Sequence, residues 1–476
     1  VVLTGQTITP NLGKDAFQEA DVFGVTMPVV KHSYLVREVN DLPRVMNEAF
    51  HLATSGRPGP VLVDLPKDVV SAECEADFTD EFHLPGYAPP ARGLTEDLEK
   101  AAELISSSKK PLLYVGAGAV IAQASRQVIG LAEKLQAPVT TTLLGKGAFP
   151  ETHPLSVGML GMHGTAYANK TVVDCDLIMA IGARWDDRIT GKVSEFCPDA
   201  TKIHIDVDPA EFGKIIDPDV SIAGDAKLVL EDLIPLVSKL DSQPWLKQIE
   251  KWKKKYPLKF PKRGGLRAQQ VLKELDRLTD SKAIISTDVG QHQMWTAQFC
   301  KTNEERKWLS SGGAGTMGYG LPSAIGAQLG CPDELVVAVV GDGGFQMTMP
   351  ELATAAIHKL PIKILIINNR YLGMVRQWQQ LFFDNRESGV DMMGNPDFVK
   401  IGEAYGIKGF HLRRTGDITK VLQKALDYND GPCIIEAEVV KSDNVFPMIP
   451  AGAAVAEMII DEPPSDKKLE KPVGST

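Results

Sequence analysis

Short apolar and β-branched runs alternate along the chain with segments in which apolar residues recur at helical spacing. This alternation is typical of parallel sheets whose strands are joined by helices. The clearest strands cover 335–340 and 362–367, with a helical pattern over 349–358 between them. The run Val1-Val2-Leu3-Thr4-Gly5 looks like a buried strand already under way. We therefore expect residues that precede Val1 in the natural protein to be absent from this sequence.

Breaks in the pattern predict an α/β protein with three doubly wound parallel-sheet domains, the first of them partial. Polar, proline-rich stretches mark one linker and the tail, and the connection before the third block carries a basic run at 251–255. We interpret that run as the solvated face of a helix. In chain order, we predict a partial first domain (1–72), a linker (73–94), a central domain (95–240), a second linker (241–265), a third domain (266–452) and a tail (453–476).

Composition narrows the class of protein. The 476 residues include 51 Lys+Arg and 61 Asp+Glu, so the formal net charge is −10. An acidic balance argues against a nucleic-acid-binding surface and fits small-molecule chemistry in the cytosol. The six cysteines show no paired spacing, which predicts reduced thiols rather than disulfides or a zinc site. No apolar run approaches the roughly 18–20 residues of a membrane span, and no leader is visible, so we expect no membrane partner.

The sharpest chemical signal is in the third block. The strand 335–340 runs into Gly341-Asp342-Gly343-Gly344, and the strand 362–367 runs into Asn368-Asn369. Both clusters therefore follow strand carboxyl ends, where open α/β sheets bind ligands. Glycines let the backbone approach phosphate oxygens, and the Asp342 and Asn369 oxygens suit Mg²⁺. Gly-Asp-Gly alone is also a common turn, but the second cluster favours a diphosphate–Mg²⁺ site.

These clusters at this spacing resemble the thiamine diphosphate (ThDP) motif of the decarboxylase and carboligase superfamily. The segments 290–295, 310–320 and 372–378 further resemble the large catalytic subunit of acetohydroxyacid synthase, also called acetolactate synthase. The resemblance extends from Val1 to about Gly452. It implies that 1–72 is the C-terminal part of a pyrimidine-binding domain, 95–240 an FAD-binding domain, and 266–452 the domain that binds the diphosphate and Mg²⁺.

The resemblance implies roles for individual residues of the third domain. Asp342, Asn369 and the main-chain oxygen of Tyr371 would hold Mg²⁺, and Met317 would push under the cofactor and keep it bent. In many relatives a serine stands where this chain has Gly344. The residues implied to contact ThDP are Gly290, Gln291, His292, Gly315, Met317, Asp342, Gly343, Gly344, Asn369, Tyr371, Leu372, Gly373 and Met374.

The second block carries strand-end signals of its own. Gly116-Ala117-Gly118 follows the strand 111–115, which by itself is a weak hint of dinucleotide binding. Acids at strand ends accept hydrogen bonds from ribose, and arginines suit pyrophosphate. The resemblance assigns these ends to FAD. The matching residues are Arg57, Gly116, Thr142, Leu143, Leu160, Gly161, Met162, His163, Gly182, Ala183, Arg184, Trp185, Asp186, Asp206 and Asp225.

The resemblance also implies the reaction and the groups that select its substrates. Pyruvate would be decarboxylated and joined to a second pyruvate or to 2-ketobutyrate, in the biosynthesis of valine, leucine and isoleucine. Arg188 matches the arginine that grips the carboxylate of the second substrate, and Trp378 the tryptophan against its ethyl group. Phe17, Gln18 and Lys67 match residues that reach the active site from a neighbouring subunit.

Several expectations follow for the whole protein. We expect a homodimer or homotetramer, a possible small regulatory subunit, and a bacterial-like cytoplasmic location. The glutamate that activates ThDP in this family matches no residue here, so we expect the chain by itself to be inactive or very poor. Two other functions stay open: a pyruvate oxidase-like flavoprotein, and a cofactor-binding fragment without activity.

Overall fold

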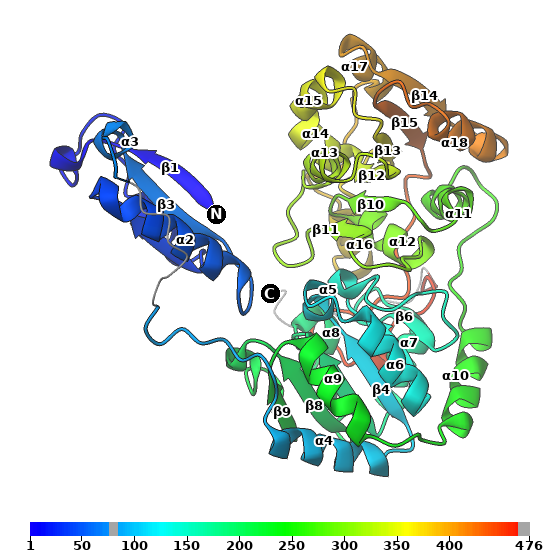
Figure 1. Ribbon diagram of the computed structural model, residues 1–476. Helices are drawn as coiled ribbons and strands as arrows, with labels where there is room; N and C mark the ends of the chain where they lie inside the picture. The colour runs from blue at the N-terminus through cyan, green and yellow to red at the C-terminus, as the bar shows by residue number, and fades with distance from the viewer. Residues whose placement is uncertain (76–83, 465–476) are drawn as a thin grey trace. The chain divides into compact units, whose positions relative to one another are not determined.

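The computed structural model describes residues 1–75 and 84–464, and it contains three sheets (Figure 1). Every strand pair with a defined register is parallel. The chain forms two compact units, one made of Val1–Gly93 with the short segments Val207–Pro209 and Ala223–Asp225, the other of the remainder. The predicted α/β class with three parallel sheets is therefore confirmed.

The first unit contains a three-stranded sheet in the order β1-β3-β2. Its middle strand is mostly buried, and α2 buries Val45, Ala49 and Leu52 with it in one core. The expected burial at the chain start is wrong for this structure, because β1 is an edge strand that leaves Val2 44% and Leu3 56% exposed. The elements are β1 (Val2–Gln6), α1 (Val22–Thr26), β2 (His32–Leu35), α2 (Leu42–Thr54), β3 (Val61–Pro66) and α3 (Lys67–Ser71).

The second unit holds two six-stranded sheets. The first, the central sheet, has the order β6-β5-β4-β7-β8-β9. Its strands are β4 (Pro111–Val115), β5 (Val139–Thr141), β6 (Ser156–Met159), β7 (Leu177–Ile181), β8 (Thr201–Asp206) and β9 (Val220–Ala223). Its helices are α4 (Thr95–Ser107), α5 (Ala117–Ile121), α6 (Ser125–Leu135), α7 (Ala166–Asp174), α8 (Asp187–Thr190), α9 (Ala226–Leu236) and α10 (Gln243–Lys255).

The second sheet of this unit, the C-terminal sheet, has the order β11-β10-β12-β13-β15-β14. Its strands are β10 (Ile284–Thr287), β11 (Trp308–Ser310), β12 (Val336–Gly341), β13 (Lys363–Asn368), β14 (Lys408–Leu412) and β15 (Cys433–Glu438). Its helices are α11 (Ala268–Thr279), α12 (Gln291–Phe299), α13 (Gly320–Gly330), α14 (Asp342–Thr348), α15 (Leu352–Ile357), α16 (Gly373–Phe382), α17 (Phe398–Ala404) and α18 (Ile418–Leu426).

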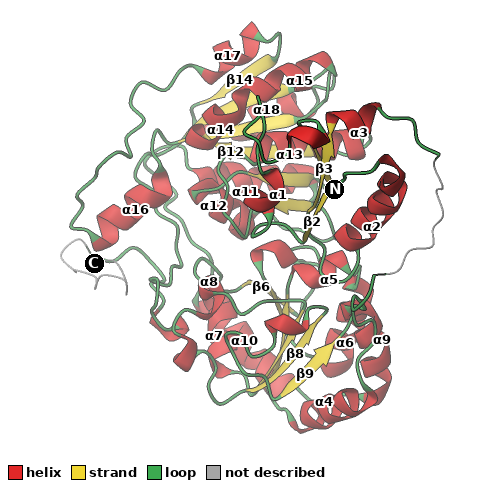
Figure 2. Cartoon of the chain, turned by 90° about the vertical axis from the view of Figure 1, so that its left-hand side faces the viewer, coloured by secondary structure: helices red, strands yellow, loops and turns green. Residues whose placement is uncertain are grey.

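Helices cover both faces of these two sheets, as Figure 2 shows for the central one. Alternate residues of β4 point to opposite cores, with Leu113 facing α4, α6 and α9 and Leu112 facing α7 and α10. Alternate residues of β12 likewise separate the core under α11 from the core under α13. Strands buried on both faces require near-continuous apolar runs, which explains why the sequence marked them clearly.

Each six-stranded sheet has one reversal of strand order between interior strands, and the C-terminal sheet has a second at its edge, where β15 precedes β14. In the central sheet the reversal falls between β4 and β7, and in the C-terminal sheet it falls between β10 and β12. The loops that leave the carboxyl ends of such neighbours diverge to opposite faces, so a crevice forms where open α/β sheets bind ligands. The strand topology thus marks two ligand edges before any side chain is considered.

Three predicted boundaries need correction. The helix after β12 begins at Asp342 itself rather than near 349, and a 3-10 turn at Met349–Glu351 separates it from α15. The glycines after Asp342 hid this start, because glycine is a poor helix former. The second linker contains α10, whose Trp245 is buried in the central domain while Lys254 and Lys255 are exposed, as predicted for its basic face.

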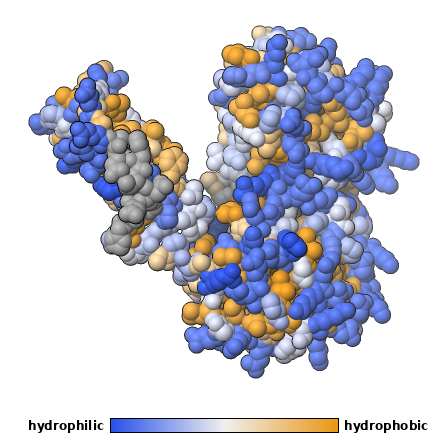
Figure 3. Space-filling model, in the orientation of Figure 1, coloured by the Kyte–Doolittle hydropathy of each residue, from blue (hydrophilic) through white to orange (hydrophobic). Residues whose placement is uncertain are grey.

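The predicted tail also starts too early. Val455 is buried against the central domain, and Met448 pairs with Ile459 in an antiparallel bridge. The remainder of the predicted first linker and tail, 76–83 and 465–476, lies outside the described residues. Over the residues that are described, no helix is both long and apolar enough to cross a membrane. Hydrophilic residues dominate the face of the larger unit seen in Figure 3.

Candidate active site

Asp342 and Asn369 lie next to each other at the carboxyl edge of the C-terminal sheet. Asp342 follows β12 and Asn369 follows β13, two neighbouring strands whose register pairs Gly341 with Ile367. Both side chains are buried, with 2% of Asp342 and 7% of Asn369 exposed. Burying a carboxylate is costly unless a cation or hydrogen bonds compensate. Two inward oxygen donors at a switch point therefore fit a hard cation such as Mg²⁺.

The environment of Asp342 makes its ionised form more costly than it is in water. Burial raises the pKa of its carboxyl to about 6, and a hydrogen bond from Asn395 opposes that rise. Asn395 donates through Nδ2 to Oδ2 of Asp342 over 2.6 Å. The sequence analysis did not identify Asn395, because it is 53 positions away in the chain.

The side chain of Asn369 is fixed by two hydrogen bonds. Its Oδ1 accepts from the Tyr371 N–H over 3.0 Å, and its Nδ2 donates to Oε1 of Gln291 over 3.2 Å. Gln291 is anchored in turn by Gln377, whose Oε1 accepts from its Nε2 over 2.9 Å. An ideal Cβ at Gly373 would be 2.1 Å from the Gln291 oxygen, so only glycine allows this approach. The structure thus brings together the predicted Asn369, Tyr371, Gln291 and Gly373.

The loop after β10 completes this edge from the other side of the switch point. Gly290 has φ +148 and opens α12, and His292 is 7% exposed. Burial lowers the pKa of His292 to about 4, so the imidazole is neutral at pH 7. Within the described part of the chain, its Nε2 is buried without a hydrogen-bond partner. A buried polar atom without a partner fits the neighbourhood of a ligand.

The glycine pair after Asp342 lies against predicted cofactor residues. An ideal Cβ at Gly343 would be 2.9 Å from Leu372 and 3.6 Å from the methyl carbon of Met317, so these residues share one neighbourhood. Gly315 has φ +65 and open space around it. Met374, in the first turn of α16, is partly buried against the core under α11.

Asp288 is a site residue that sequence reasoning missed. Its carboxylate is fully buried and accepts hydrogen bonds from the N–H groups of Val289, Gly318 and Gly320 at 2.8–3.0 Å. These bonds tie the loop that carries Met317 to the end of β10. One signal was available: Asp288 directly follows a strand, as Asp342 does. An ideal Cβ at Gly344 would be 2.2 Å from the Asp288 Oδ1, which explains why glycine suits that position here.

The residues predicted for FAD lie mainly at the carboxyl edge of the central sheet. Gly116 follows β4, Thr142 follows β5, Leu160 follows β6 and Gly182 follows β7. Gly116 and Gly182 meet across the switch point, since an ideal Cβ at Gly116 would be 2.3 Å from the Gly182 carbonyl oxygen. Gly182 has φ +57, a conformation that favours glycine. The backbone therefore forms this edge at the point where the strand order reverses.

The loop from Leu160 to His163 is held by Asn169, which the sequence analysis missed. Asn169 is fully buried, accepts from the Gly161 N–H over 2.8 Å and donates to the Gly161 carbonyl over 3.0 Å. Burial lowers the pKa of His163 to about 4, and its Nδ1 has no hydrogen-bond partner among the described residues. Met162 is fixed by main-chain bonds to Arg188 and Ile449.

The segment after β7 divides between the core and the surface. Trp185 is 2% exposed, packs on Tyr114 and donates through Nε1 to Nδ1 of His204. Its indole is therefore part of the core, and a cofactor would meet this residue through its main chain. Arg184 is 46% exposed and extends toward Asp186, with 3.9 Å between their charged groups. Burial raises the pKa of Asp186.

The other predicted FAD residues have different surroundings. Thr142 caps the 3-10 turn Leu143–Gly145 through its hydroxyl, and Ala183 is buried in the core. Asp206 ends β8, 3.9 Å from the buried His204. In the first unit, the Asp225 N–H donates to Ala91, and Arg57 pairs with Asp208 over 3.1 Å.

The two residues predicted to select substrate differ in exposure. Arg188 is 60% exposed beside Asp187, and Trp378 is partly buried on α16 in an edge contact with Phe382. In the first unit, Gln18 is exposed with φ +61, and Lys67 is exposed at the start of α3. Phe17 is 89% exposed. The roles predicted for these side chains stay predictions.

Two family models match the chain. The model described as the central domain of thiamine pyrophosphate enzymes matches residues 98–233, and the model described as their C-terminal TPP binding domain matches residues 288–437. The first range covers most of the central sheet and the second most of the C-terminal sheet, with Asp342, Asn369 and His292 inside it.

Similar proteins in other organisms are described as acetolactate synthases. The large subunits from Cyanidium caldarium and Porphyra purpurea are each 46% identical over 96% of this chain, which covers 80% and 79% of them. The acetolactate synthase of Mycobacterium bovis is 44% identical over 96% of this chain, which covers 76% of it. The chain therefore belongs to the family of acetolactate synthase large subunits.

Proposed function

We propose that the protein is a ThDP-dependent acetolactate synthase. It decarboxylates pyruvate and joins the two-carbon unit to a second pyruvate or to 2-ketobutyrate, giving 2-acetolactate or 2-aceto-2-hydroxybutyrate for branched-chain amino-acid biosynthesis. The observation that carries the proposal is the buried pair Asp342 and Asn369 at the carboxyl ends of β12 and β13, next to the switch point of a matched TPP-binding domain. The identity to acetolactate synthases over nearly the whole chain selects this reaction within the wider family.

The metal site would use Asp342, Asn369 and the main-chain oxygen of Tyr371. Magnesium is commonly held by one or two protein ligands together with substrate phosphates, which matches this small donor set beside the glycines at 343 and 344. A divalent cation there would also compensate the buried Asp342 carboxylate. ThDP, when bound, supplies the carbon nucleophile and the electron sink for decarboxylation.

The chain's own residues would position that cofactor. The buried, partnerless Nε2 of the neutral His292 would accept a hydrogen bond from a donor group of the ligand, and Gln291 links the proposed metal ligand Asn369 to α16. Asp288 holds the loop of Met317 against β10, which fixes the side chain we propose to bend the cofactor. Preorganised groups of this kind lower the cost of reaching the reactive geometry.

We place FAD at the carboxyl edge of the central sheet, where the predicted residues follow successive strands. The neutral, partnerless Nδ1 of His163 and the exposed guanidinium of Arg184 are available for hydrogen bonds to a bound flavin nucleotide.

Arg188 and Trp378 are proposed to select the second substrate, Arg188 by binding its carboxylate through two parallel hydrogen bonds. Gln18 and Lys67 would serve the site of a neighbouring subunit in a homodimer or homotetramer, and a small regulatory subunit and a bacterial-like cytoplasmic location remain further proposals.

The test is a turnover assay on the complete protein with pyruvate, ThDP, Mg²⁺ and FAD. We expect acetolactate, measured as acetoin after acid treatment, and with added 2-ketobutyrate also the six-carbon product. Omitting ThDP or Mg²⁺ should abolish both products, and Asp342→Asn should do the same. Flavin reduction during pyruvate consumption, without acetolactate, would instead establish a pyruvate oxidase. Cofactor binding without any product would leave only the binding role.

A further inference from the structure

The loop that leads into α17 carries two residues that contact different strands of the C-terminal sheet or the residues that follow them. It begins after the antiparallel bridge between Tyr371 and Asp391, and it contains Asn395 and Asp397 on either side of Pro396. Proline fixes its own φ and restricts the residue before it, so the relative positions of these two side chains vary little. Neither was predicted from the sequence to have a function.

Asn395 is the end of the loop that contacts the proposed metal site. Its Nδ2 donates to Oδ2 of Asp342 over 2.6 Å, and its Oδ1 accepts from Nε2 of Gln346 over 3.1 Å. Gln346 donates also to the main-chain oxygen of Asp342 over 3.1 Å. Because the amide oxygen of Asn395 is already bound by a donor, its NH₂ group must face the carboxylate. Asn395, supported by Gln346, therefore sets the orientation of the Asp342 carboxylate.

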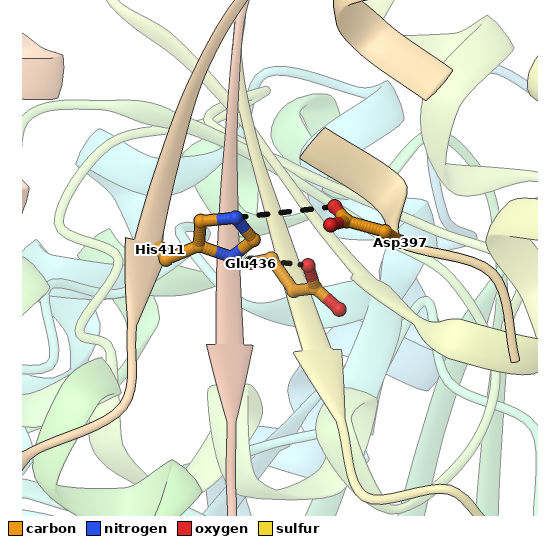
Figure 4. A group of neighbouring side chains, drawn as sticks. All are labelled: Asp397, His411 and Glu436. Atoms are coloured by element: carbon orange, nitrogen blue, oxygen red, sulfur yellow. Dashed lines mark ion pairs between the residues drawn. The ribbon is translucent and has the colours of Figure 1, made fainter. Parts of the chain in front are cut away.

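Asp397 is the end of the loop that contacts a histidine. It caps α17 by accepting from the Lys400 N–H over 3.1 Å, and its Oδ1 is 3.9 Å from Nε2 of His411 on β14. The other ring nitrogen of His411, Nδ1, is 3.4 Å from Oε2 of Glu436 on β15. Figure 4 shows the two carboxylates beside the imidazole, each paired with a different ring nitrogen. Glu436 is only 4% exposed.

These three side chains are also a possible set of metal ligands. A metal ion, however, binds one ring nitrogen of a histidine, and the other ligands must gather around that same nitrogen. Here Asp397 pairs with Nε2 and Glu436 pairs with Nδ1, so the two carboxylates approach different ring nitrogens. The arrangement is that of an imidazole bridging two carboxylates rather than that of a chelate.

Glu436 extends the bridge back to the metal site. Its Oε1 accepts from Nδ2 of Asn368 over 2.8 Å. The Oδ1 of Asn368 accepts from the Arg370 N–H over 3.2 Å and lies 3.4 Å from Nδ2 of Asn395. Asn368 directly precedes Asn369 in the chain. A closed network thus runs from Asn395 through the loop, His411 and Glu436 and returns to Asn395.

We propose that Asn395 is a positioning residue for the metal-binding carboxylate of Asp342, and that the Asp397–His411–Glu436 bridge holds Asn395 in place. This inference rests on the proposed function, since it assigns Asp342 to the Mg²⁺ that accompanies ThDP. Outer partners of this kind typically change metal affinity about 10–100-fold when they are removed. The bridge acts only through the loop, so its effect is smaller than that of Asn395.

The experiment is a calorimetric titration of Mg²⁺ into metal-free protein with ThDP present, on wild type, Asn395→Ala and the control Met393→Ala. Met393 is in the same loop and its side chain is 88% exposed. We expect Asn395→Ala to weaken Mg²⁺ binding about tenfold, with FAD affinity and melting temperature close to wild type. Unchanged Mg²⁺ affinity in Asn395→Ala would overturn the inference alone. Failure of wild type to bind Mg²⁺ and ThDP would overturn the proposed function as well.

A double-mutant cycle tests the bridge. His411→Phe removes both ring nitrogens, and we expect it to weaken Mg²⁺ binding about threefold in wild type and not at all in Asn395→Ala. An equal effect of His411→Phe in both backgrounds would show that it acts independently of Asn395 and would refute the bridge. Zn²⁺ binding at micromolar concentration that disappears in His411→Phe would identify a chelate, and would refute it too.

Discussion

The two six-stranded parallel sheets differ in strand order and have chemically different carboxyl edges. Each has a reversal of strand order between interior strands, β4 and β7 in one and β10 and β12 in the other, and presents loops at that point. At the C-terminal edge, the buried side chains of Asp342, Asn369 and Gln291 and the partly buried Asn395 take part in hydrogen bonds among these residues. At the central edge, Gly116 and Gly182 bring the backbone together, and Arg184 points to the surface. The topology therefore locates both sites, and the side chains decide what each can bind.

The difference follows from the ligands that we propose. A small, doubly charged metal ion needs donors at fixed positions in a dry environment, so its ligands are buried and oriented by further hydrogen bonds. A long dinucleotide contacts many strand ends weakly, and backbone groups that line a crevice suffice for most of them. Variants that separate the two edges test this contrast directly.

The largest effect is expected for Asp342→Ala. The variant removes the carboxylate of the proposed metal site, so we expect Mg²⁺-dependent ThDP binding to weaken by more than about a hundredfold. This exceeds the roughly 10–100-fold loss of metal affinity typical when a residue that only hydrogen bonds to a metal ligand is removed. FAD binding at the central edge should not change. The control is Asp333→Ala, an exposed acid before the opposite end of β12. Parallel loss of FAD and ThDP binding in Asp342→Ala would mean that the two edges are not separate sites.

A smaller effect is expected for Asp288→Asn. Its carboxylate accepts three main-chain N–H groups, and an amide of the same shape must turn an NH₂ group toward at least one of them. Leaving a buried donor without an acceptor costs about 1–3 kcal/mol. We expect about that loss in the free energy of unfolding and a weaker affinity for ThDP, measured by denaturation and calorimetry. Asp280→Asn, at the exposed C-cap of α11 before the same strand, is the control.

Asn169→Ala tests the central edge in the same way. The side chain holds both the N–H and the carbonyl of Gly161, and all of it is buried. We expect a loss of about 1–3 kcal/mol in unfolding free energy and weaker FAD binding, with Mg²⁺-dependent ThDP binding retained. Val173→Ala, on the same helix and 40% exposed, should change neither affinity. Weaker ThDP binding in Asn169→Ala, at unchanged FAD affinity, would contradict the assignment of this loop.

The sequence predicted the parts of this fold that depend on local pattern. The strands expected at 335–340 and 362–367 are Val336–Gly341 and Lys363–Asn368, one residue later, because buried parallel strands are apolar throughout. The positions of Asp342 and Asn369 followed, since a strand's end places the next residue at the sheet edge.

The residues that were missed depend on distant parts of the chain. Asn395 reaches Asp342 across 53 positions, and Asp288 reaches Gly318 and Gly320 across 30 and 32. Nothing in the spacing of Asn395 or Asn169 distinguishes them from ordinary loop and helix residues. Trp185 shows a different limit of sequence analysis. Its position beside strand-end residues predicted a cofactor contact, but position alone could not indicate that its indole packs in the core.

The smallest expected effect is on the pH dependence of stability, and it comes from a histidine beneath the central edge. His204 accepts from the Trp185 N–H at Nδ1, and its Nε2 is 3.0 Å from the Ala183 oxygen, which fits a neutral ring that donates at Nε2. Burial lowers the pKa of His204 from 6.5 to about 4. The unfolded chain therefore binds a proton that the folded chain excludes, so stability falls as pH decreases from 6.5 toward 4.

The measurement is the free energy of unfolding in denaturant at pH 7.5 and 5.5, for wild type, His204→Gln and the exposed control His358→Gln. A shift of this size costs wild type about 1 kcal/mol at pH 5.5. His204→Gln lacks the titrating ring, so its loss on acidification should be smaller by that amount, whatever its stability at pH 7.5. Equal acid losses in wild type and His204→Gln would show that this ring is not held neutral. The surroundings of His204 beneath the central edge would then accept a charged ring. In that case the two edges would differ less in how strongly burial disfavours charge.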